Sequence, residues 1–355
     1  MKKCILLTGG GTAGHVTPNM ALIPHLRDAG LDIAYVGSYD GIEKKLIEEM
    51  EIPYYPIHSG KMRRYFDIKN FSDPFRVIQG WGQALRLIRK LKPAVIFSKG
   101  GFVSVPVVMA GRMAGVPCVI HESDMTPGLA NKLAVPFAKT VCTNFEETLQ
   151  YLPEKKAVHT GTPIRESLLR GSRYEGFRIT GFPEDKPVIL IMGGSMGAGA
   201  VNDVVWEAVP ELVGQYSVVH LCGKGKKNES LAGLAGYFQM EYADEELSHL
   251  YAIADVMVSR AGANALSEIL ALRVPSVLIP LPLSASRGDQ ILNARSFETK
   301  GYSRVLEQEG MTAERLRDAI GAVYRDRAAY RRAMGATHVK SGIEEVMKVI
   351  LRCAE

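Results

Sequence analysis

The chain has 355 residues, of which 46% are hydrophobic and 23% charged, and a formal net charge of +5. This length predicts two domains with a core each, and the mild charge without any nucleic-acid-binding motif argues against a DNA or RNA partner. The five scattered cysteines show no zinc-type spacing and predict reduced thiols of a cytoplasmic protein, while no apolar run approaches the length of a membrane span.

The first predicted strand, residues 4–8, ends in the loop GGGTAGH. Glycines after a strand let backbone N–H groups approach an anion, and a helix N-terminus favours negative charge. His15 stands at the start of the next helix, where a general base could reach a hydroxyl nucleophile; a structural histidine is the alternative. The second strand, 31–38, ends in Gly37 and Ser38 where an NAD site needs an acidic residue. A nicotinamide oxidoreductase is therefore disfavoured.

A basic stretch with interleaved aromatic residues follows between Lys61 and Lys92. Within its predicted helix, 75–91, apolar side chains recur at helical spacing; they are Ile78, Trp81, Leu85 and Ile88. A solvated basic face is the favoured interpretation. The alternative is a patch that meets an anionic membrane surface.

Further predicted strands occupy residues 93–98, 117–122 and 139–144, with a helix at 105–114 between the first two. The second of these strands ends in HESD, so Glu122 and Asp124 could orient sugar hydroxyls at the carboxyl edge of a sheet. The alternative is that one of them caps the helix that Pro127 could begin.

The strand and glycine turn of residues 4–14, CILLTGGGTAG, return at residues 188–199 as VILIMGGSMGAG. Each is the opening unit of a Rossmann-like half. Strands and helices alternate after both, which predicts α/β domains with parallel sheets. The sequence thus predicts two such domains in tandem that face each other across a cleft, with residues 161–169 as the linker.

The segment SRAGANALSEIL, residues 259–270, carries the strongest binding signal of the second half. Its Ala-Gly turn leads from a strand into a helix whose N-terminus can meet an anion. Glu268, on that helix, is suited to the two hydroxyls of a ribose because a carboxylate accepts from both. A solvated glutamate is the alternative. In SRGDQILNAR, residues 286–295, Gln290 and Asn293 share a face that could meet a sugar.

These motifs together resemble one family. GGGTAGHVTP, SKGGFVSVP, HES-x3-PG-x2-NK, GTPIR, GGSMGA, SRAGANALSE and GDQ-x2-NA occur in the order typical of the MurG family, glycosyltransferase family 28. The resemblance spans nearly the whole chain. It implies a GT-B fold with an acceptor and membrane-associating domain at 1–162, a UDP-sugar domain at 163–340, and a helix at 341–355 that packs back on the first domain.

The resemblance also implies an activity. A member of this family is an inverting hexosyltransferase that moves GlcNAc from UDP-GlcNAc to the MurNAc 4-hydroxyl of undecaprenyl-linked lipid I, in peptidoglycan synthesis. It needs no metal or other cofactor and is peripheral to the cytoplasmic face of the cell membrane. The implied partners are therefore UDP-GlcNAc, lipid I and an anionic membrane surface, and not nucleic acid.

By resemblance, His15 and Glu122 are the candidate catalytic residues, either of which would assist the acceptor hydroxyl. The implied substrate-binding residues are Thr12, Ala13, Gly14, Asp124, Arg165, Ser195, Ala243, Gly262, Ala263, Asn264, Ala265, Leu266, Ser267, Glu268 and Gln290. Arg165 and Ser195 would contact the nucleotide, residues 263–268 its phosphate and ribose, Ala243 the uracil, and Gln290 the donor sugar.

Three positions depart from the family pattern. Asp124 stands where an asparagine is usual, Phe102 where a tyrosine is frequent, and Asp289 where a glutamine is common. An ionised Asp cannot donate a hydrogen bond, so acceptor preference could differ. The alternatives are another GT-B UDP-sugar transferase with a lipid acceptor such as diacylglycerol, a divergent second copy of the family enzyme, and a non-catalytic relative that binds sugar nucleotide.

Overall fold

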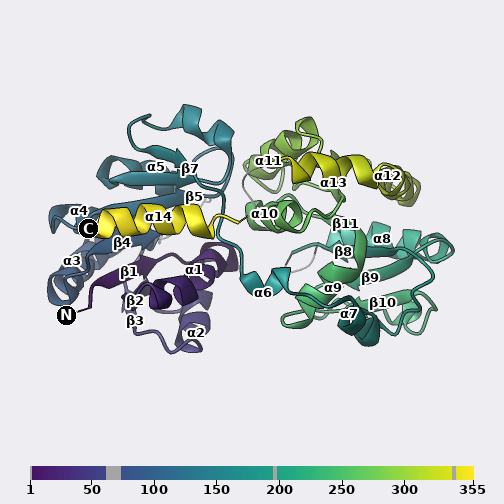
Figure 1. The fold of residues 1–355 in the computed structure, drawn as a ribbon, viewed down its shortest axis with the longest axis horizontal. Helices are drawn as coiled ribbons and strands as arrows, with labels where there is room; N and C mark the ends of the chain where they lie inside the picture. The colour runs from purple at the N-terminus through teal and green to yellow at the C-terminus, as the bar shows by residue number, and fades with distance from the viewer. Residues whose placement is uncertain (1, 61–72, 195–197, 338–340) are drawn as a thin grey trace. The chain divides into compact units, whose positions relative to one another are not determined.

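The computed structural model describes residues 2–60, 73–194, 198–337 and 341–355. The chain divides into two compact units, Met1–Arg165 with Ser341–Glu355, and Glu166–Lys340. The boundary expected after residue 162 lies three residues before this division. Both units are α/β, as the sequence predicts (Figure 1). Within the described ranges, no helix has the length and apolar character needed to cross a membrane.

Unit 1 is built on a sheet of seven parallel strands in the order β3-β2-β1-β4-β5-β6-β7. The strands are β1 Cys4–Thr8, β2 Asp32–Ser38, β3 Tyr54–Ile57, β4 Val95–Ser98, β5 Cys118–Glu122, β6 Thr140–Thr143 and β7 Ala157–His159. The central strands read as near-continuous apolar runs because helices cover both faces of the sheet. The helices are α1 Thr17–Asp28, α2 Ile42–Glu48, α3 Asp73–Leu91, α4 Ser104–Met113, α5 Leu129–Ala134 and α14 Ile343–Ala354.

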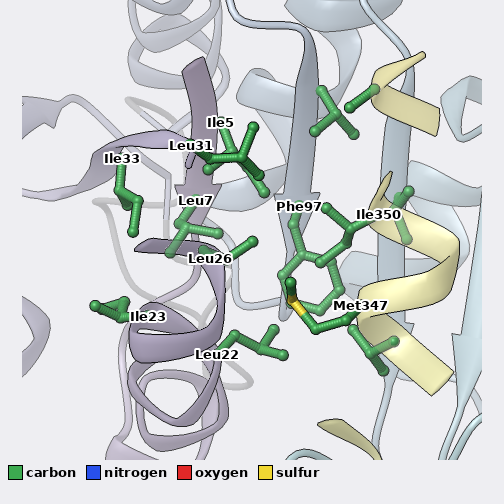
Figure 2. Close-up of a cluster of buried hydrophobic side chains, with 14 of the residues drawn as sticks. Ile5, Leu7, Leu22, Ile23, Leu26, Leu31, Ile33, Phe97, Met347 and Ile350 are labelled. Carbon is green, nitrogen blue, oxygen red and sulfur yellow. The ribbon is translucent and has the colours of Figure 1, made fainter. Parts of the chain in front are cut away.

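Each face of the first sheet carries its own apolar core. On one face, α1 and α14 pack on β1, β4 and β5, and Figure 2 shows Met347 and Ile350 of α14 beside Phe97 of β4. On the other face, α3 and α4 cover the sheet with Ala84, Ile88 and neighbouring side chains. The last helix is therefore part of the core of unit 1, although it follows unit 2 in the sequence (Figure 1).

Unit 2 repeats this topology with six parallel strands in the order β10-β9-β8-β11-β12-β13. The strands are β8 Val188–Met192, β9 Ser217–Leu221, β10 Tyr237–Met240, β11 Ala254–Ser259, β12 Ser276–Leu278 and β13 Ser303–Val305. One face is covered by α8 (Gly199–Leu212) and α12 (Ala313–Arg325), whose apolar side chains form the core with β8, β9, β11 and β12. The remaining helices are α6 Glu166–Leu169, α7 Arg173–Thr180, α9 Glu246–Ile253, α10 Ala263–Leu272, α11 Asp289–Thr299 and α13 Arg327–Gly335.

The strand order changes direction at one point in each sheet, between β1 and β4 in unit 1 and between β8 and β11 in unit 2. Ligands of doubly wound sheets bind outside the carboxyl ends of the strands at such a switch point. The loops that follow these four strands carry the glycine motifs, which are GGGTAG and SKGG in unit 1, and GGSMG and SRAG in unit 2. The topology thus brings together motifs that lie about 90 and 70 residues apart along the chain.

Candidate functional site

The switch point of unit 1 is closely packed. Gly101 has φ +84°, and a Cβ on it would overlap the carbonyl oxygen of Gly10. A Cβ on Gly100 would lie 3.7 Å from Cδ2 of His15 and 3.5 Å from Oδ1 of Asn131. Three motifs of the sequence, GGGTAGH, SKGG and HES-x3-PG-x2-NK, are therefore in contact at this edge.

A buried carboxylate occupies the glycine loop after β1. Glu43 of α2 is fully buried, and its Oε2 accepts from the N–H of Gly11 at 3.2 Å while Oε1 accepts from the N–H of Ser38 at 2.9 Å. A Cβ on Gly10, Gly37 or Gly41 would collide with the Glu43 side chain. The N–H of Gly11 is thus bonded to an anion of the chain itself. The role of the other amides of this loop toward a phosphate stays a prediction.

His15 ends the short 3-10 turn Ala13–His15 that precedes α1. Its Nδ1 lies 3.0 Å from the carbonyl oxygen of Gly10 and 3.3 Å from Oγ1 of Thr12. Because a carbonyl only accepts, Nδ1 carries the proton and Nε2 keeps its lone pair. Burial and the nearby Lys99 ammonium lower the pKa of His15, against smaller opposing effects of Gly10 and Glu43. The neutral imidazole is the form that can act as a base near pH 7.

Glu122 ends β5 and is buried, and it binds the loop that follows. Its Oε1 accepts from the N–H groups of Ser123 and Asp124 at 2.8 and 3.0 Å. Its Oε2 accepts from the N–H of Gly128 at 2.9 Å and from Nδ2 of Asn131 at 2.8 Å. Burial and Asp124 raise the pKa of Glu122, while these donors oppose the rise. These four hydrogen bonds hold the loop, and two of them are to Gly128 and Asn131 at the start of α5, as the capping alternative expects. The catalytic role of Glu122 stays a prediction.

A buried lysine, which sequence reasoning did not select, lies beside this cluster. Lys99 follows β4 and is 1% exposed. Its Nζ lies 2.9 Å from Nδ1 of His121 and donates to Oγ of Ser123. Nε2 of His121 lies 2.8 Å from the carbonyl oxygen of Gly161, so His121 is neutral and accepts from Lys99 through Nδ1. The sequence signal was a charged residue between an apolar strand and two glycines.

The other unit 1 residues implied by the resemblance lie around the same loops or near the chain's exit from the unit. Thr12, Ala13 and Gly14 form the turn that leads into His15. Asp124 lies in the loop bound by Glu122, and its carbonyl accepts from Oγ1 of Thr148 at 3.3 Å. Arg165 is the last residue of the first segment of unit 1. Their roles toward a substrate stay predictions.

Two glycines at the switch point of unit 2, Gly194 and Gly262, have room beside them in the described structure, whereas a Cβ on Gly193 would overlap Ala198. Among the described atoms, nothing lies within 4 Å of a Cβ built on Gly194 or on Gly262. Gly262 is the N-cap of α10 with φ −70°, a backbone conformation open to any residue. The first N–H groups of α10 have no carbonyl one turn earlier to bond, and the helix dipole makes this end positive. The loop therefore offers amides and space together, which is how helix N-termini bind phosphates.

Two buried side chains, Arg260 and Asn293, hydrogen-bond to backbone carbonyls around this turn. Arg260 donates from Nη1 to the carbonyl oxygen of Ile279 at 3.0 Å, which joins the ends of β11 and β12. Asn293 of α11 is fully buried and donates from Nδ2 to the carbonyl oxygen of Ala261 at 3.3 Å. Asn293, predicted to share a sugar-facing side of its helix with Gln290, is therefore a core residue that supports the SRAG turn.

Glu268 lies one turn into α10, half-buried, with its carboxylate held from α9. Tyr251, 3% exposed, donates its hydroxyl hydrogen to Oε2 of Glu268 at 2.9 Å. This bond restricts the rotamer of Glu268. Of the other residues implied on this helix, Ala263, Leu266 and Ser267 are buried, and Asn264 and Ala265 are half-buried. Ser267 bonds back to the carbonyl of Ala263, so only backbone N–H groups near residue 263 suit a phosphate.

The remaining unit 2 predictions concern three separate loops. Gln290 is half-buried, and its Oε1 accepts from the N–H of Leu281 at 3.1 Å, so its amide nitrogen is the donor that could face a sugar. Ala243 is 4% exposed and follows β10, which leaves its backbone as the group that could meet a base. Ser195 lies outside the described residues.

The basic stretch is described only from residue 73 onward, so the part from Lys61 to residue 72 lies outside the described residues. Along α3, Trp81 and Leu85 pack against the core and Ile88 is buried, so these residues belong to the fold. Ile78 is 63% exposed, and Arg86, Arg89 and Lys90 are exposed as well. The helix thus has a structural apolar face and a solvated basic face. No group of three His, Cys, Asp or Glu in the described part of the chain is arranged to hold a metal ion.

Comparison with known proteins places this geometry in a family. Residues 5–143 match the model of the glycosyltransferase family 28 N-terminal domain, and residues 188–349 match that of its C-terminal domain. A relative from Lachnospira eligens is named UDP-N-acetylglucosamine--N-acetylmuramyl-(pentapeptide) pyrophosphoryl-undecaprenol N-acetylglucosamine transferase. It is 56% identical over 350 residues, 99% of each chain. A relative of the same name from Lachnoclostridium phytofermentans is 54% identical over 348 residues, 98% of each chain. The crystal structure of Acinetobacter baumannii MurG is similar with a TM-score of 0.78 and 26% identity, over 99% of each chain.

Proposed function

The chain belongs to glycosyltransferase family 28, and from this premise we propose that it transfers N-acetylglucosamine from UDP-N-acetylglucosamine to the N-acetylmuramyl 4-hydroxyl of undecaprenyl-linked lipid I, which gives lipid II. The structural observation that carries the proposal is the open switch point of unit 2, where Gly262 leaves space at the N-terminus of α10 and Tyr251 holds Glu268 in place. A diphosphate and a ribose need these two features together.

Unit 2 binds the donor in this proposal. The N–H groups at the start of α10 bind the diphosphate, Glu268 accepts from the ribose hydroxyls, and Gln290 donates to the sugar through its amide nitrogen. Arg165 and Ser195 add contacts to the nucleotide, and backbone near Ala243 meets the uracil. The leaving UDP gains negative charge as the glycosidic bond breaks. The helix dipole and amides stabilise that charge, so the reaction requires no metal ion or other cofactor.

Unit 1 binds the acceptor and supplies the base. Nε2 of His15 takes the proton of the acceptor 4-hydroxyl as its oxygen bonds to the anomeric carbon and the bond to UDP breaks, with inversion at that carbon. Gly10 holds the opposite side of the imidazole through Nδ1. Glu122 orients the loop that carries Asp124, and the turn from Thr12 to Gly14 lies beside the base. We assign Glu122 to positioning because both of its oxygens are engaged.

A transfer assay with radiolabelled UDP-N-acetylglucosamine and a lipid I analogue tests the proposed reaction. We expect labelled lipid II, and undiminished turnover in EDTA. Diacylglycerol as acceptor and UDP-glucose as donor are the comparison arms. Transfer to diacylglycerol alone supports the alternative of another lipid-acceptor transferase, whereas UDP binding without any turnover supports a non-catalytic relative.

We also propose that the enzyme works as a peripheral protein at the cytoplasmic face of the cell membrane, where its lipid acceptor lies. The exposed Ile78 beside exposed Arg86, Arg89 and Lys90 on α3 fits a surface that meets anionic lipid. Sedimentation with vesicles tests this. Binding to phosphatidylglycerol vesicles that weakens with salt, and weakens further in an R86Q/R89Q variant, is expected; equal binding to neutral vesicles contradicts the proposal.

A further inference from the structure

Two buried residues of opposite charge, from different elements of unit 1, act on His15. The positive charge is Lys99, at the end of β4, and the negative charge is Glu43, on α2. Both influence the imidazole, and Lys99 has the larger effect. Glu43 also bonds Gly11, next to the Gly10 carbonyl that holds Nδ1. The buried charges of Lys99 and Glu43 therefore contribute to the electrostatic environment of His15, the base of the proposed reaction.

Lys99 is well connected for a buried cation. A buried ammonium is costly unless acceptors surround it. Its two hydrogen-bond acceptors, His121 and Ser123, are neutral, while the negative charges that act on it are those of Glu122, at the end of β5, and Asp124, in the loop that follows. His159 on β7 and Cys142 on β6 are the further titratable groups of this cluster. Burial lowers the pKa of Lys99 to about 8, so the side chain is charged at neutral pH and loses its charge above that range.

The contacts of Lys99 also link the catalytic loops. Through Ser123 it holds the segment whose amides bind Glu122, and through His121 it reaches the Gly161 carbonyl at the end of unit 1's sheet. A Cβ built on its neighbour Gly100 would lie 3.7 Å from Cδ2 of His15, so the backbone after Lys99 runs close to this ring. A displacement of Lys99 would therefore reach the base through the backbone as well as through charge.

We propose that Lys99 is a positioning residue for the transfer reaction, whose buried ammonium holds the 121–123 segment and keeps His15 in the neutral form that accepts the acceptor's proton. The inference rests on the proposed function, because it concerns the same base. It assigns two tasks to one side chain: a geometric one, through Ser123 and His121, and an electrostatic one, toward His15. Only the second task depends on charge.

Charge and hydrogen bonding can be separated by substitution. K99Q keeps an N–H donor for His121 and Ser123 but removes the charge, and K99R keeps the charge. E43Q removes the opposite charge and leaves Lys99 untouched. I96A, on the same strand and fully buried, is an uncharged control for lost stability. Thermal melting of each variant checks that it is folded.

The measurement is the pH profile of kcat for lipid II formation between pH 5 and 9. The decrease of kcat at acid pH is expected to begin at higher pH in K99Q than in the wild type, because His15 without the Lys99 charge is protonated more readily. In E43Q this decrease is expected to begin at lower pH. In K99R and I96A it is expected at the same pH as in the wild type.

Two results overturn the inference. One is a K99Q profile that is lowered by the same factor at every pH, which assigns Lys99 a structural role alone. The other is an unmoved acid limb in E43Q, which removes the electrostatic link even if K99Q does not fold. A wild-type enzyme that transfers no GlcNAc contradicts the proposed function itself, and so the two failures are distinguishable.

Discussion

The two switch points share a topology and differ in what fills them. In unit 1, Gly10 and Gly101 are in contact with each other, and Glu43 occupies the loop as an internal anion. In unit 2, no described atom lies where a side chain on Gly194 or Gly262 would project, and buried Arg260 and Asn293 hydrogen-bond to backbone around the turn. The chain itself fills the first site, whereas the second has space beside a helix N-terminus.

This difference shows that a glycine motif alone does not identify a phosphate site. Glycine is needed both where two backbones touch and where a ligand approaches a backbone. What separates the two cases is the partner of the amide, which is the Glu43 carboxylate in unit 1. The division of labour follows from it: unit 2 suits an anionic leaving group, and unit 1 suits a neutral hydroxyl and its base.

The largest effect is expected from removal of the base in unit 1. H15A is predicted to lower kcat about 10²- to 10⁴-fold, the usual contribution of general base catalysis. UDP affinity is predicted to stay unchanged because the donor binds unit 2. Single-turnover transfer and calorimetric titration with UDP measure the two quantities. Near-wild-type turnover would remove His15 from the mechanism, and lost UDP binding would break the assignment of ligands to units.

The paired variants G101A and G262A test the packing contrast directly. G101A forces an alanine into a left-handed conformation, at about 1–2 kcal/mol, and against the Gly10 carbonyl, at about 1–3 kcal/mol. G262A meets no described atom and has an unstrained φ, so its melting temperature is expected to stay near that of the wild type while KM for the donor rises. If thermal melts show that G101A and G262A lower the melting temperature equally, the proposed difference in packing between the two switch points is wrong.

A smaller effect is expected at the ribose contact. E268Q replaces a charged acceptor, and hydrogen bonds to charged groups contribute about 1.5–3 kcal/mol, which corresponds to a rise of about 10- to 100-fold in donor KM. Y251F removes the bond that orients Glu268 and is predicted to raise donor KM less, with kcat retained. Steady-state kinetics with varied donor measure both. A lower kcat at unchanged KM in E268Q would exclude the ribose assignment.

A buried histidine of unit 2, His220, is expected to make the stability of that unit depend on pH in the acid range. His220 accepts from Tyr237 through Nδ1 and donates to Asn202 through Nε2, and burial lowers its pKa to about 4. The unfolded chain binds the proton more readily than the folded chain does. The contribution of neutral His220 to the free energy of unfolding is therefore complete above pH 6.5 and is lost as the pH falls toward 4. About 2 kcal/mol is expected to be lost between pH 6.5 and 5.

Urea unfolding at several pH values measures this loss, and H220Q is expected to flatten it. His121 of unit 1 is also buried with a lowered pKa, so some acid sensitivity remains in the variant. An H220Q curve parallel to that of the wild type from pH 6.5 to 5 would contradict the role of His220.

Much of the fold could be predicted from the sequence because parallel strands leave a strong local pattern. Runs such as CILLT and VILIM are apolar throughout since both faces are covered, and each ends in glycines where the chain turns into a helix. Relative order along the chain then specifies the parallel topology. Of the four apolar residues at helical spacing on α3, Trp81, Leu85 and Ile88 do lie on a packed face, whereas Ile78 is 63% exposed.

The partners of the site could not be predicted in the same way. Glu43 is one of several charged residues on a short surface helix, and its burial depends on room left by glycines at positions 10, 37 and 41. In the sequence, Tyr251 is an aromatic residue of a helix, and nothing in the local pattern indicates its hydrogen bond to Glu268. Glu122 was identified, but its four hydrogen bonds depend on backbone donors up to six residues away and on the side chain of Asn131, nine residues away.

By itself, the sequence determined the two α/β units, the glycine turns at their strand ends, and the residues that resemble a sugar-nucleotide transferase, because each of these is a local pattern of residue types. Only the tertiary structure decided which glycine loop is filled and which is open, and which titratable groups surround His15. Those outcomes depend on side chains that converge from separate strands and helices, and charge and space in a protein interior are set by all of them together.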